Sequence, residues 1–286
     1  MKSLCFLTSL LFASSIISAQ RLHIGAFGGL AAYNGDLVDR IFPKKVTNGA
    51  IGITVNYELR DQIMLRGGIT YSIVGGADRY GHDPELIARN LSFETKIVEF
   101  SAIGEYYFFN LYDRRYSPYI FAGLAVYHFD PYTYYNNNKV YLKPLSTEGQ
   151  GLPGYPARKP YALTQPAIPF GAGIKFVIND RLRVGLEVGV RKLFTDYLDD
   201  VSSLYADPND LLAAKGQLSV DLSYRGDELP RGDPSYPPKA YIRGGEKYKD
   251  IYYFTGLHLT YRLGGGVGTS AFGRKNKRLN CPTVPQ

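Results

Sequence analysis

Hydrophobic and polar residues alternate one by one along several segments of this chain. In the clearest segment, residues 181–191, every second position is apolar: Leu182, Val184, Leu186, Val188 and Val190. The positions between them include Arg181, Arg183, Glu187 and Arg191. A period of two predicts a β-strand, because successive side chains of a strand point to opposite faces. A strand of roughly ten residues with one apolar and one charged face is long enough to cross a bilayer in a barrel.

The same pattern predicts eight strands, near residues 21–33, 50–59, 62–75, 91–109, 118–129, 168–178, 181–194 and 250–263. Three connections are short, at 60–61, 110–117 and 179–180, and four are long, at 34–49, 76–90, 130–167 and 195–249. Short turns at one rim and long loops at the other are typical of outer-membrane barrels. We therefore predict an all-β fold, an eight-stranded antiparallel transmembrane β-barrel with short periplasmic turns and long extracellular loops. A secreted soluble sandwich is the alternative.

Residues 1–19 have the layout of a cleaved signal peptide. Lys2 supplies a positive charge, an apolar stretch follows, and Ala19 precedes the expected cleavage point. Ser9, Ser14 and Ser15 interrupt the stretch, whereas a membrane anchor needs roughly 18 or more unbroken apolar residues. We predict a signal peptide over 1–19, the barrel over 20–263 and a basic periplasmic C-terminal tail over 264–286. This layout predicts an outer-membrane protein whose two termini lie in the periplasm.

Composition agrees with a membrane barrel. The chain has 25 tyrosines and 15 phenylalanines, and aromatic rings of this kind form the girdles at both interfaces of such barrels. The formal net charge of +7 could indicate a nucleic-acid-binding protein. The export signal and the scattering of the basic residues over strands and tail argue against that class of partner, and we expect outer-membrane lipid instead.

Nine charged side chains fall on the inward face of the predicted barrel. They are Glu58, Arg66, Glu99, Glu105, Lys175, Arg183, Glu187, Arg191 and Arg262. An eight-stranded barrel is only wide enough to be filled by its own side chains, and opposite charges in such a lumen pair because an unpaired buried charge is costly. We therefore predict a closed lumen rather than a diffusion pore.

The chemistry-bearing residues do not form a catalytic pattern. The four histidines, His23, His82, His128 and His258, lie on separate segments without the spacing of a metal site. No nucleophile has a base at a defined spacing, and paired lumen carboxylates are more often structural than catalytic. We expect no enzymatic activity, no metal and no cofactor.

The long loops carry local folding signals. Asp207 and Pro208 predict the start of a short helix that continues to Lys215. Asp196, Asp199 and Asp200 are predicted to cap a short helix, with a loose cation site as the alternative. The glycine-rich segment 148–151 predicts that its loop folds back over the barrel mouth, because glycine permits close backbone approach.

Five motifs resemble one known family. They are Tyr-Asn-Gly-Asp-Leu at 33–37, Arg-Asn-Leu-Ser-Phe at 89–93, Pro-Tyr-Ile-Phe-Ala-Gly-Leu at 118–124, Leu-Ser-Thr-Glu-Gly-Gln-Gly at 145–151 and Phe-Thr-Asp-Tyr-Leu-Asp-Asp-Val-Ser at 194–202. Together they resemble the PorG-type outer-membrane barrels of the Bacteroidota, over nearly the whole chain after the signal peptide. The last motif is the most specific, and Ser146 stands where the family has glycine.

The resemblance implies a component of the type IX secretion system, which exports proteins across the outer membrane and supports gliding motility. It implies a non-enzymatic barrel that associates with the periplasmic ring formed by a lipoprotein and its partner. The closed lumen predicted from the alternation agrees with such an anchor or scaffold. A passive structural barrel and a surface enzyme acting on lipid or peptide are the alternatives.

The C-terminal tail carries four basic residues and no acidic one. These residues are Arg274, Lys275, Lys277 and Arg278. We predict that the tail docks on an acidic surface of the periplasmic ring, although a solvated tail without a partner would have the same composition. Cys281 is the only cysteine after the signal peptide, so it is a candidate for an intermolecular disulfide in an oxidising compartment.

Overall fold

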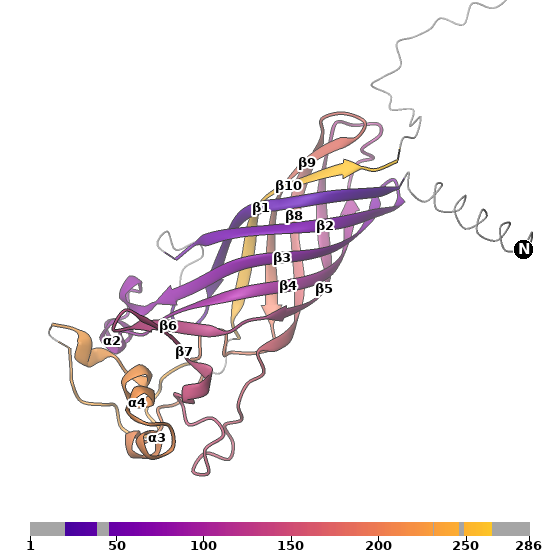
Figure 1. Cartoon of the computed structure of the whole chain (residues 1–286). Helices are drawn as coiled ribbons and strands as arrows, with labels where there is room; N and C mark the ends of the chain where they lie inside the picture. Colours follow the sequence, from indigo (N-terminus) through magenta and orange to yellow (C-terminus); the bar gives the residue numbers. More distant parts are fainter. Residues whose placement is uncertain (1–20, 39–45, 231, 246–248, 265–286) are drawn as a thin grey trace, which may run out of the picture.

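The computed structural model of the chain describes residues 21–38, 46–230, 232–245 and 249–264. Eight long strands form the body of the molecule (Figure 1). Their bounds are β1 Leu22–Asn34, β2 Asn48–Arg60, β3 Ile63–Ala77, β4 Ser92–Tyr107, β5 Tyr116–His128, β8 Thr164–Val177, β9 Leu182–Leu193 and β10 Ile251–Arg262. Each predicted strand is present, within a few residues of its expected ends.

The strands close into a barrel. They follow the order β3-β2-β1-β10-β9-β8-β5-β4, and β3 pairs with β4 to complete the ring. Every pair is antiparallel, from β1 with β10 to β3 with β4. A closed ring leaves no long wall strand with an unpaired edge. The predicted fold class, a closed eight-stranded antiparallel barrel, is confirmed.

The connections differ sharply between the two ends of the barrel. The end that we call the turn rim carries the short connections 61–62, 108–115 and 178–181. The other end, the loop rim, carries the long connections 35–47, 78–91, 129–163 and 194–250. The start of β1 and the end of β10 lie at the turn rim, where His23 pairs with Arg262 (Figure 1).

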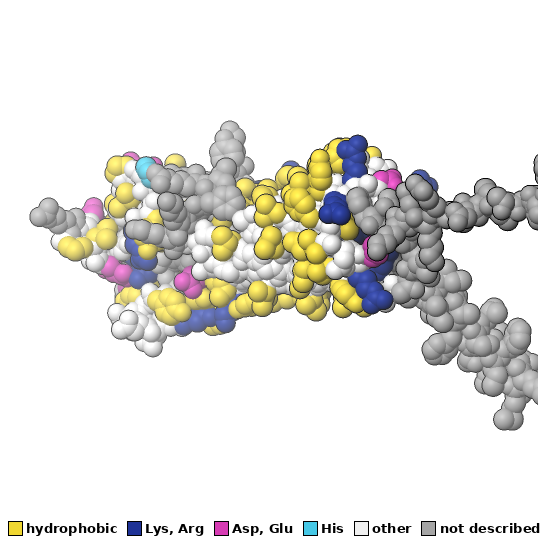
Figure 2. Space-filling view, turned by 90° about the horizontal axis from the view of Figure 1, so that it is seen from above, with side chains coloured by type: hydrophobic (Ala, Val, Ile, Leu, Met, Phe, Trp, Pro, Cys, Tyr) yellow, Lys and Arg dark blue, Asp and Glu magenta, His cyan; other side chains and the backbone are white. Residues whose placement is uncertain are grey.

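Alternation along each strand separates an apolar outer face from a polar interior. On β9, Leu186 and Val188 are 51% and 46% exposed, whereas Arg183 and Glu187 are buried. On β2, Ile51 and its alternate neighbours are exposed in the same way. Figure 2 shows hydrophobic side chains over the middle of the wall, with charged side chains toward the ends. Such a wide exposed apolar surface is unusual for a soluble monomer and is the surface that a lipid-facing barrel presents.

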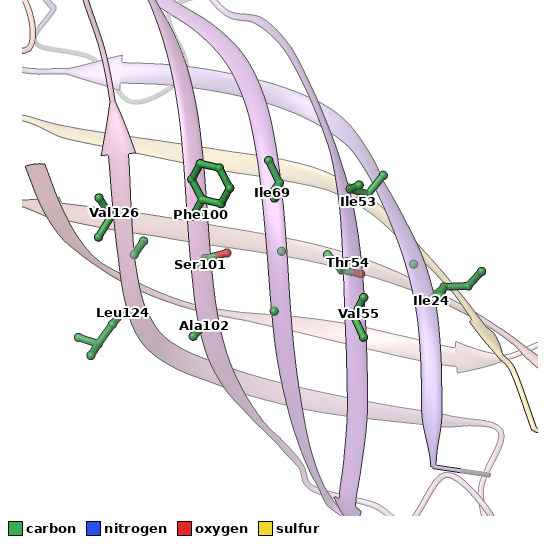
Figure 3. Close-up of a pocket in the computed structure, with 14 residues that line it drawn as sticks. Ile24, Ile53, Thr54, Val55, Ile69, Phe100, Ser101, Ala102, Leu124 and Val126 are labelled. Atoms are coloured by element: carbon green, nitrogen blue, oxygen red, sulfur yellow. The ribbon is translucent and has the colours of Figure 1, made fainter. Parts of the chain in front are cut away.

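A shallow apolar groove of about 860 Å³ crosses this outer wall from β1 to β5 (Figure 3). Gly67 and Ala102, which pair across β3 and β4, line its middle. Ile69, Phe100 and Leu124 are larger outward residues along the same groove. The groove results from small residues beside large ones on the lipid-facing side of the wall.

The ladder between β5 and β8 is interrupted where β8 carries proline. Ala122 pairs with Phe170, and the next pair in the register is Ala125 with Ala167. Pro169 lies in the gap, and a proline has no N–H to donate to a strand ladder. β8 begins at Thr164, earlier than the predicted start at residue 168.

The long loops are folded. They contain the short helices η1 Asp78–Tyr80, α2 Pro84–Arg89, η2 Lys143–Leu145, α3 Pro208–Lys215, α4 Gln217–Ser223 and η3 Gly226–Glu228. Asp207 accepts a hydrogen bond from the N–H of Asn209, so the predicted helix start at Pro208 is confirmed. None of the helices in the described ranges is long and apolar enough to cross a membrane.

One hairpin in the third long loop was not predicted. β6 Pro131–Tyr135 pairs with β7 Asn138–Tyr141 and continues the sheet from β4. Asn136 and Asn137 connect the two strands, both with positive φ. Asparagine tolerates this conformation, and two consecutive positive φ values are what a tight type I′ hairpin turn requires. The asparagine run at 136–138 was the available signal.

Candidate functional site

The nine charged residues predicted to face inward all lie on the inner side of the wall. Eight of them are buried: Glu58, Arg66, Glu99, Glu105, Lys175, Arg183, Glu187 and Arg191. Arg262, at the end of β10, is half-buried. The structure therefore brings together side chains that come from six different strands, and it arranges them in three groups along the barrel axis.

Arg66 is the centre of the middle group. Its Nε lies 3.1 Å from Glu105 Oε1, and its Nη1 lies 2.7 Å from Glu187 Oε2. Lys175 Nζ donates to the other oxygen of Glu105 at 3.2 Å and is completely buried. Tyr119 donates to Glu187 at 2.7 Å. A buried charge needs an opposite charge and further hydrogen bonds, and this group supplies both.

The two other groups lie toward the rims. Near the loop rim, Arg191 Nε lies 3.1 Å from Glu99 Oε2, and Tyr252 donates to the same oxygen at 2.7 Å. Near the turn rim, Glu58 forms ion pairs with Arg183 at 3.6 Å and Arg262 at 3.7 Å. Tyr112, from the connection between β4 and β5, donates to Glu58 at 2.7 Å. Charged and aromatic side chains thus cross the lumen at three levels.

The structure places His258 beside Glu105 and Glu187, with ligand atoms within 4.8 Å of one another. Three such groups could hold a metal ion, and the spacing of the histidines along the chain did not reveal this cluster. Arg66 already bridges all three, because its Nη1 also lies 3.2 Å from His258 Nδ1. The guanidinium supplies the positive charge that a metal would supply, so we interpret the cluster as part of the ion network.

A second buried charged region lies at the loop rim, where the long loops fold together. We call the described parts of residues 35–38, 78–91, 129–163 and 194–250 the loop cap. Glu148 is its central side chain: it is completely buried, and its Oε1 accepts from the N–H of Ser202 at 2.9 Å and from Arg243 Nη1 at 2.9 Å. Its Oε2 accepts from the Ser203 hydroxyl at 2.7 Å. One carboxylate therefore ties the third long loop to the fourth.

Arg243 and Arg89 extend this connection to the second long loop. Arg243 Nη1 also donates to the Asp200 carbonyl at 2.8 Å, and Arg89 donates to the Arg243 carbonyl. Arg89 in turn forms a two-pronged ion pair with Asp78, at 2.8 and 2.6 Å. Bidentate arginine–carboxylate pairs are geometrically specific as well as strong. The cap is thus a structure with its own buried polar core.

A cluster of four aspartates, which we call the acidic centre, lies where the first and fourth long loops meet: Asp36, Asp196, Asp199 and Asp250. The Tyr33 hydroxyl lies 2.6 Å from Asp199 Oδ2 and 3.0 Å from Asp250 Oδ1. Asp36 accepts from the N–H of Gly245 with both oxygens. Asp196, Asp199 and Asp250 are each no more than 2% exposed.

Burial shifts the pKa values of these aspartates upward. Burial, followed by the charges of neighbouring aspartates, raises the pKa of Asp199 and of Asp250 well above the ordinary range. Burial and the charge of Asp36 raise the pKa of Asp196 to about 7. Nearby, burial raises the pKa of Asp200 to about 6, although Arg243 opposes the shift. The acidic centre therefore favours bound protons at neutral pH.

Four of the five motifs that the sequence singled out converge on this cap. Tyr33 and Asp36 come from the first motif, Arg89 from the second, Glu148 from the fourth and Asp199 from the last. Sequence reasoning treated them as separate local features, because their spacing along the chain exceeds the reach of any turn. The loop containing Glu148 packs on the fourth long loop at the loop rim, through contacts with Ser202 and Ser203.

The role predicted for Asp196, Asp199 and Asp200 needs correction. The chain is not helical between 194 and 207, so these residues cap no helix. Asp199 instead accepts from the N–H of Val201 at 2.9 Å, and Asp200 accepts from Thr147 and Tyr161 at 2.6 Å. Burial under the other loops, which local sequence does not reveal, decides their environment. The residues of the predicted docking tail, including Cys281, lie outside the described residues.

A family model with the description "Domain of unknown function (DUF6089)" matches residues 2–213, and the chain belongs to this family. No curated protein matches the sequence.

Several solved barrels are similar to the chain in fold. Neisserial surface protein A is 8% identical, with a TM-score of 0.41, and the match covers 84% of this chain and 96% of that one. Ail of Yersinia pestis is 8% identical, with a TM-score of 0.40 and the same coverage. OprG of Pseudomonas aeruginosa is 9% identical, with a TM-score of 0.40, and the match covers 85% of this chain and 97% of that one. These likenesses concern the course of the chain and carry no statement about its function.

Proposed function

We propose that this protein is a non-enzymatic outer-membrane component of the type IX secretion and gliding machinery, and that it anchors or scaffolds the periplasmic ring. The proposal combines two kinds of support. The physical support is a closed barrel with an apolar outer wall and a filled lumen. The support for the machinery is the resemblance of the five motifs to PorG-type barrels.

The membrane part of the proposal rests on the outer wall. Ile51, Ile53 and Leu124 are 65%, 67% and 71% exposed on neighbouring parts of the barrel surface. Burying such side chains in hydrocarbon is favourable by roughly 25 cal/mol for each Å² removed from water. Apart from the gap between β5 and β8, the closed ladder pairs the backbone groups of the wall, which a bilayer interior demands. The outer membrane is therefore the environment that this surface fits.

The closed lumen is the observation that carries the scaffold role. Arg66, Lys175 and their glutamate partners cross the middle of the barrel, and the loop cap covers one end. A folded polypeptide, or even an extended one, would have to break these buried ion pairs to pass. We infer that the barrel contributes a fixed point in the membrane rather than a route through it.

The scaffold role sets the orientation. We propose that the turn rim faces the periplasm, with the loop cap outside the cell. The basic tail, with Arg274, Lys275, Lys277 and Arg278, would then leave the barrel on the side of the ring lipoprotein and its partner. Cys281 would be placed to form an intermolecular disulfide there.

A deletion strain tests the role in secretion. We expect loss of export of many cargo proteins, restored by the full chain. Normal export with an altered envelope would favour a passive barrel, and loss of one surface activity alone would favour an enzyme; either result would overturn the proposal. A chain lacking residues 272–286 tests the tail. Electrophoresis before and after boiling is the control, because an assembled barrel migrates differently from the boiled protein.

Two further measurements separate docking from transport. Non-reducing electrophoresis of envelopes should show an adduct with a ring protein that disappears in Cys281→Ser. Purified protein in planar bilayers should show no stable conductance, because side chains fill an eight-stranded interior. Reproducible large channels would contradict the scaffold role.

A further inference from the structure

Among the described residues, the acidic centre of the loop cap has an excess of buried carboxylates over cations. Four aspartates meet there, and the charged groups that face them are Glu148, Arg89, Arg243 and Lys249. Arg89 is already paired with Asp78, and Arg243 with Glu148. Several unneutralised buried carboxylates would repel one another strongly. Lys249 acts on Asp196. The charges that act on Asp199 and Asp250 among the described residues are those of other aspartates, so a bound proton would relieve their repulsion.

The contacts of Tyr33 indicate where a bound proton lies. Its hydroxyl lies within hydrogen-bond distance of Asp199 Oδ2 and of Asp250 Oδ1, at 2.6 and 3.0 Å. A phenol carries one proton and can donate it to only one of two carboxylates. The second contact is favourable only if the other carboxyl group carries a proton and donates it to the tyrosine oxygen.

Asp196 provides an independent indication. Its Oδ2 accepts from the Ser202 hydroxyl at 3.0 Å, but its buried Oδ1 receives no hydrogen bond in the structure. The residue is 2% exposed and faces Asp36 and Asp250. A buried ionised oxygen without a donor is costly, whereas the protonated group loses its net charge and with it most of that cost.

We propose that Asp199 and Asp250 share one proton across Tyr33, and that this proton locks the loop cap onto the barrel. The lock joins three segments that are far apart in sequence: the end of β1, the start of the fourth long loop and the residue that precedes β10. Loss of the proton leaves two adjacent buried anions, and the cap opens locally while the barrel wall stays folded.

The direction of the pH dependence follows from linkage. Burial is the first cause that raises the pKa values of Asp199 and Asp250 in the folded cap; the next is the charge of Asp250 for Asp199 and the charge of Asp196 for Asp250. The folded cap therefore binds more protons than the open cap, so its stability is greatest at low pH and falls as pH rises through the folded pKa. Between the pKa of the open cap, near the ordinary aspartate value, and the folded pKa, release of one proton lowers the equilibrium constant for cap closure tenfold for each pH unit.

Two backbone amides report directly on the lock. The N–H of Leu198 donates to Asp250 Oδ2 at 2.9 Å, and the N–H of Val201 donates to Asp199 Oδ1 at 2.9 Å. Hydrogen exchange of the full chain in detergent measures how readily each amide loses this hydrogen bond. The rates are corrected for the intrinsic pH dependence of exchange. We expect the protection of both amides to fall up to tenfold per pH unit between the open-cap pKa and the folded pKa, while the protection of β9 stays constant.

Asp250→Asn and Asp199→Asn test the assignment separately, because an amide mimics the protonated carboxyl group. Each should keep the cap closed at alkaline pH and remove the pH dependence. Asp210→Asn is the matched control: Asp210 is an exposed aspartate of the same cap that pairs with Lys239 at 3.3 Å, and its substitution should leave the profile unchanged.

Three results would overturn the shared proton. The first is wild-type protection that does not change between about pH 5 and pH 9. The second is a pH dependence that survives in both asparagine variants. The third is protection at alkaline pH that is restored by added calcium and lost with a chelator, since a metal ion would then supply the charge.

Discussion

The lumen and the loop cap both bury charged side chains, but they neutralise them by different means. In the lumen, each of Glu58, Glu99, Glu105 and Glu187 forms an ion pair with an arginine or a lysine. In the cap, the buried ion pairs among described residues are centred on Arg89 and Arg243. The acidic centre relies on Tyr33 and backbone N–H groups.

The difference reflects where the residues stand. Lumen side chains project from strands whose ladders fix their positions, so opposite charges meet in a register that the whole barrel maintains. Cap residues come from loops that are held mainly by the polar contacts themselves. A region held by permanent cations should be insensitive to moderate pH, whereas one held by protons should respond to it. Buried charges neutralised by ion pairs therefore form a region whose stability is independent of moderate pH. Buried charges neutralised by protons form a region that opens when the pH rises.

Removing the central cation of the lumen should have the largest effect. Arg66→Met leaves Glu105 and Glu187 without the guanidinium that joins them, and loss of one partner of a buried pair costs about 3–5 kcal/mol. We expect a lower free energy of unfolding in urea, measured with the barrel in lipid vesicles. An unchanged unfolding midpoint would show that the lumen does not hold the barrel together.

A charge on the outer wall should cost somewhat less. Val188 is 46% exposed on β9, and Val188→Arg places a cation on the lipid-facing surface. Near the bilayer midplane this costs roughly 2–4 kcal/mol. Val188→Ala is the control, with an expected cost of about 1 kcal/mol. If Val188→Arg folds into vesicles as well as Val188→Ala, the wall at this position does not face lipid.

Disrupting the hub of the cap should act locally. Glu148→Gln removes the charge that Arg243 contacts at 2.9 Å, and a hydrogen bond to a charged group contributes about 1.5–3 kcal/mol. Proteolysis or hydrogen exchange should show easier opening of residues 194–206, while the urea midpoint of the barrel stays the same. Unfolding of cap and barrel together would mean that the two regions form one cooperative unit.

The smallest change in stability is expected from Asp196→Asn. Unlike the three substitutions above, it should stabilise the protein. Burial raises the pKa of Asp196 to about 7, so folding favours the proton and the ionised group destabilises the cap above that pH. The asparagine variant should close the cap more firmly at pH 8, by about 1 kcal/mol, and make little difference at pH 5. A variant that is less stable at pH 8 would contradict this prediction. It would show that the ionised Asp196 carboxylate has a stabilising partner.

The barrel was largely predictable because its signal is local and repeated. Leu186 and Val188 lie on one face of a strand, and Arg183 and Glu187 lie on the other. This short alternation predicts both the strand and which of its side chains point into the barrel. The hairpin of β6 and β7 was missed because its strands are short and the asparagine turn lies inside a loop rich in tyrosine. The ladder gap at Pro169 was also invisible, since it depends on which strand lies beside it.

The cap could not be derived in the same way. Asp199, Glu148 and Arg89 lie far apart along the chain, and each has a local explanation that does not require the others. The proximity of Glu105, Glu187 and His258 in the lumen was hidden for the same reason. Their electrostatic environments depend on burial, which is a property of the assembled loops and strands.

The amino-acid sequence by itself determined the eight strands, the faces they present and the rims at which turns and loops lie, because side-chain alternation and turn chemistry act over a few residues. Only the tertiary structure decided which charges meet. The closure of β3 on β4 brings Arg66 to its glutamates, and the folding of four loops brings Asp199 and Asp250 to Tyr33. Coulomb energy and desolvation depend on distance and burial in three dimensions, and neither quantity can be read from positions along a chain.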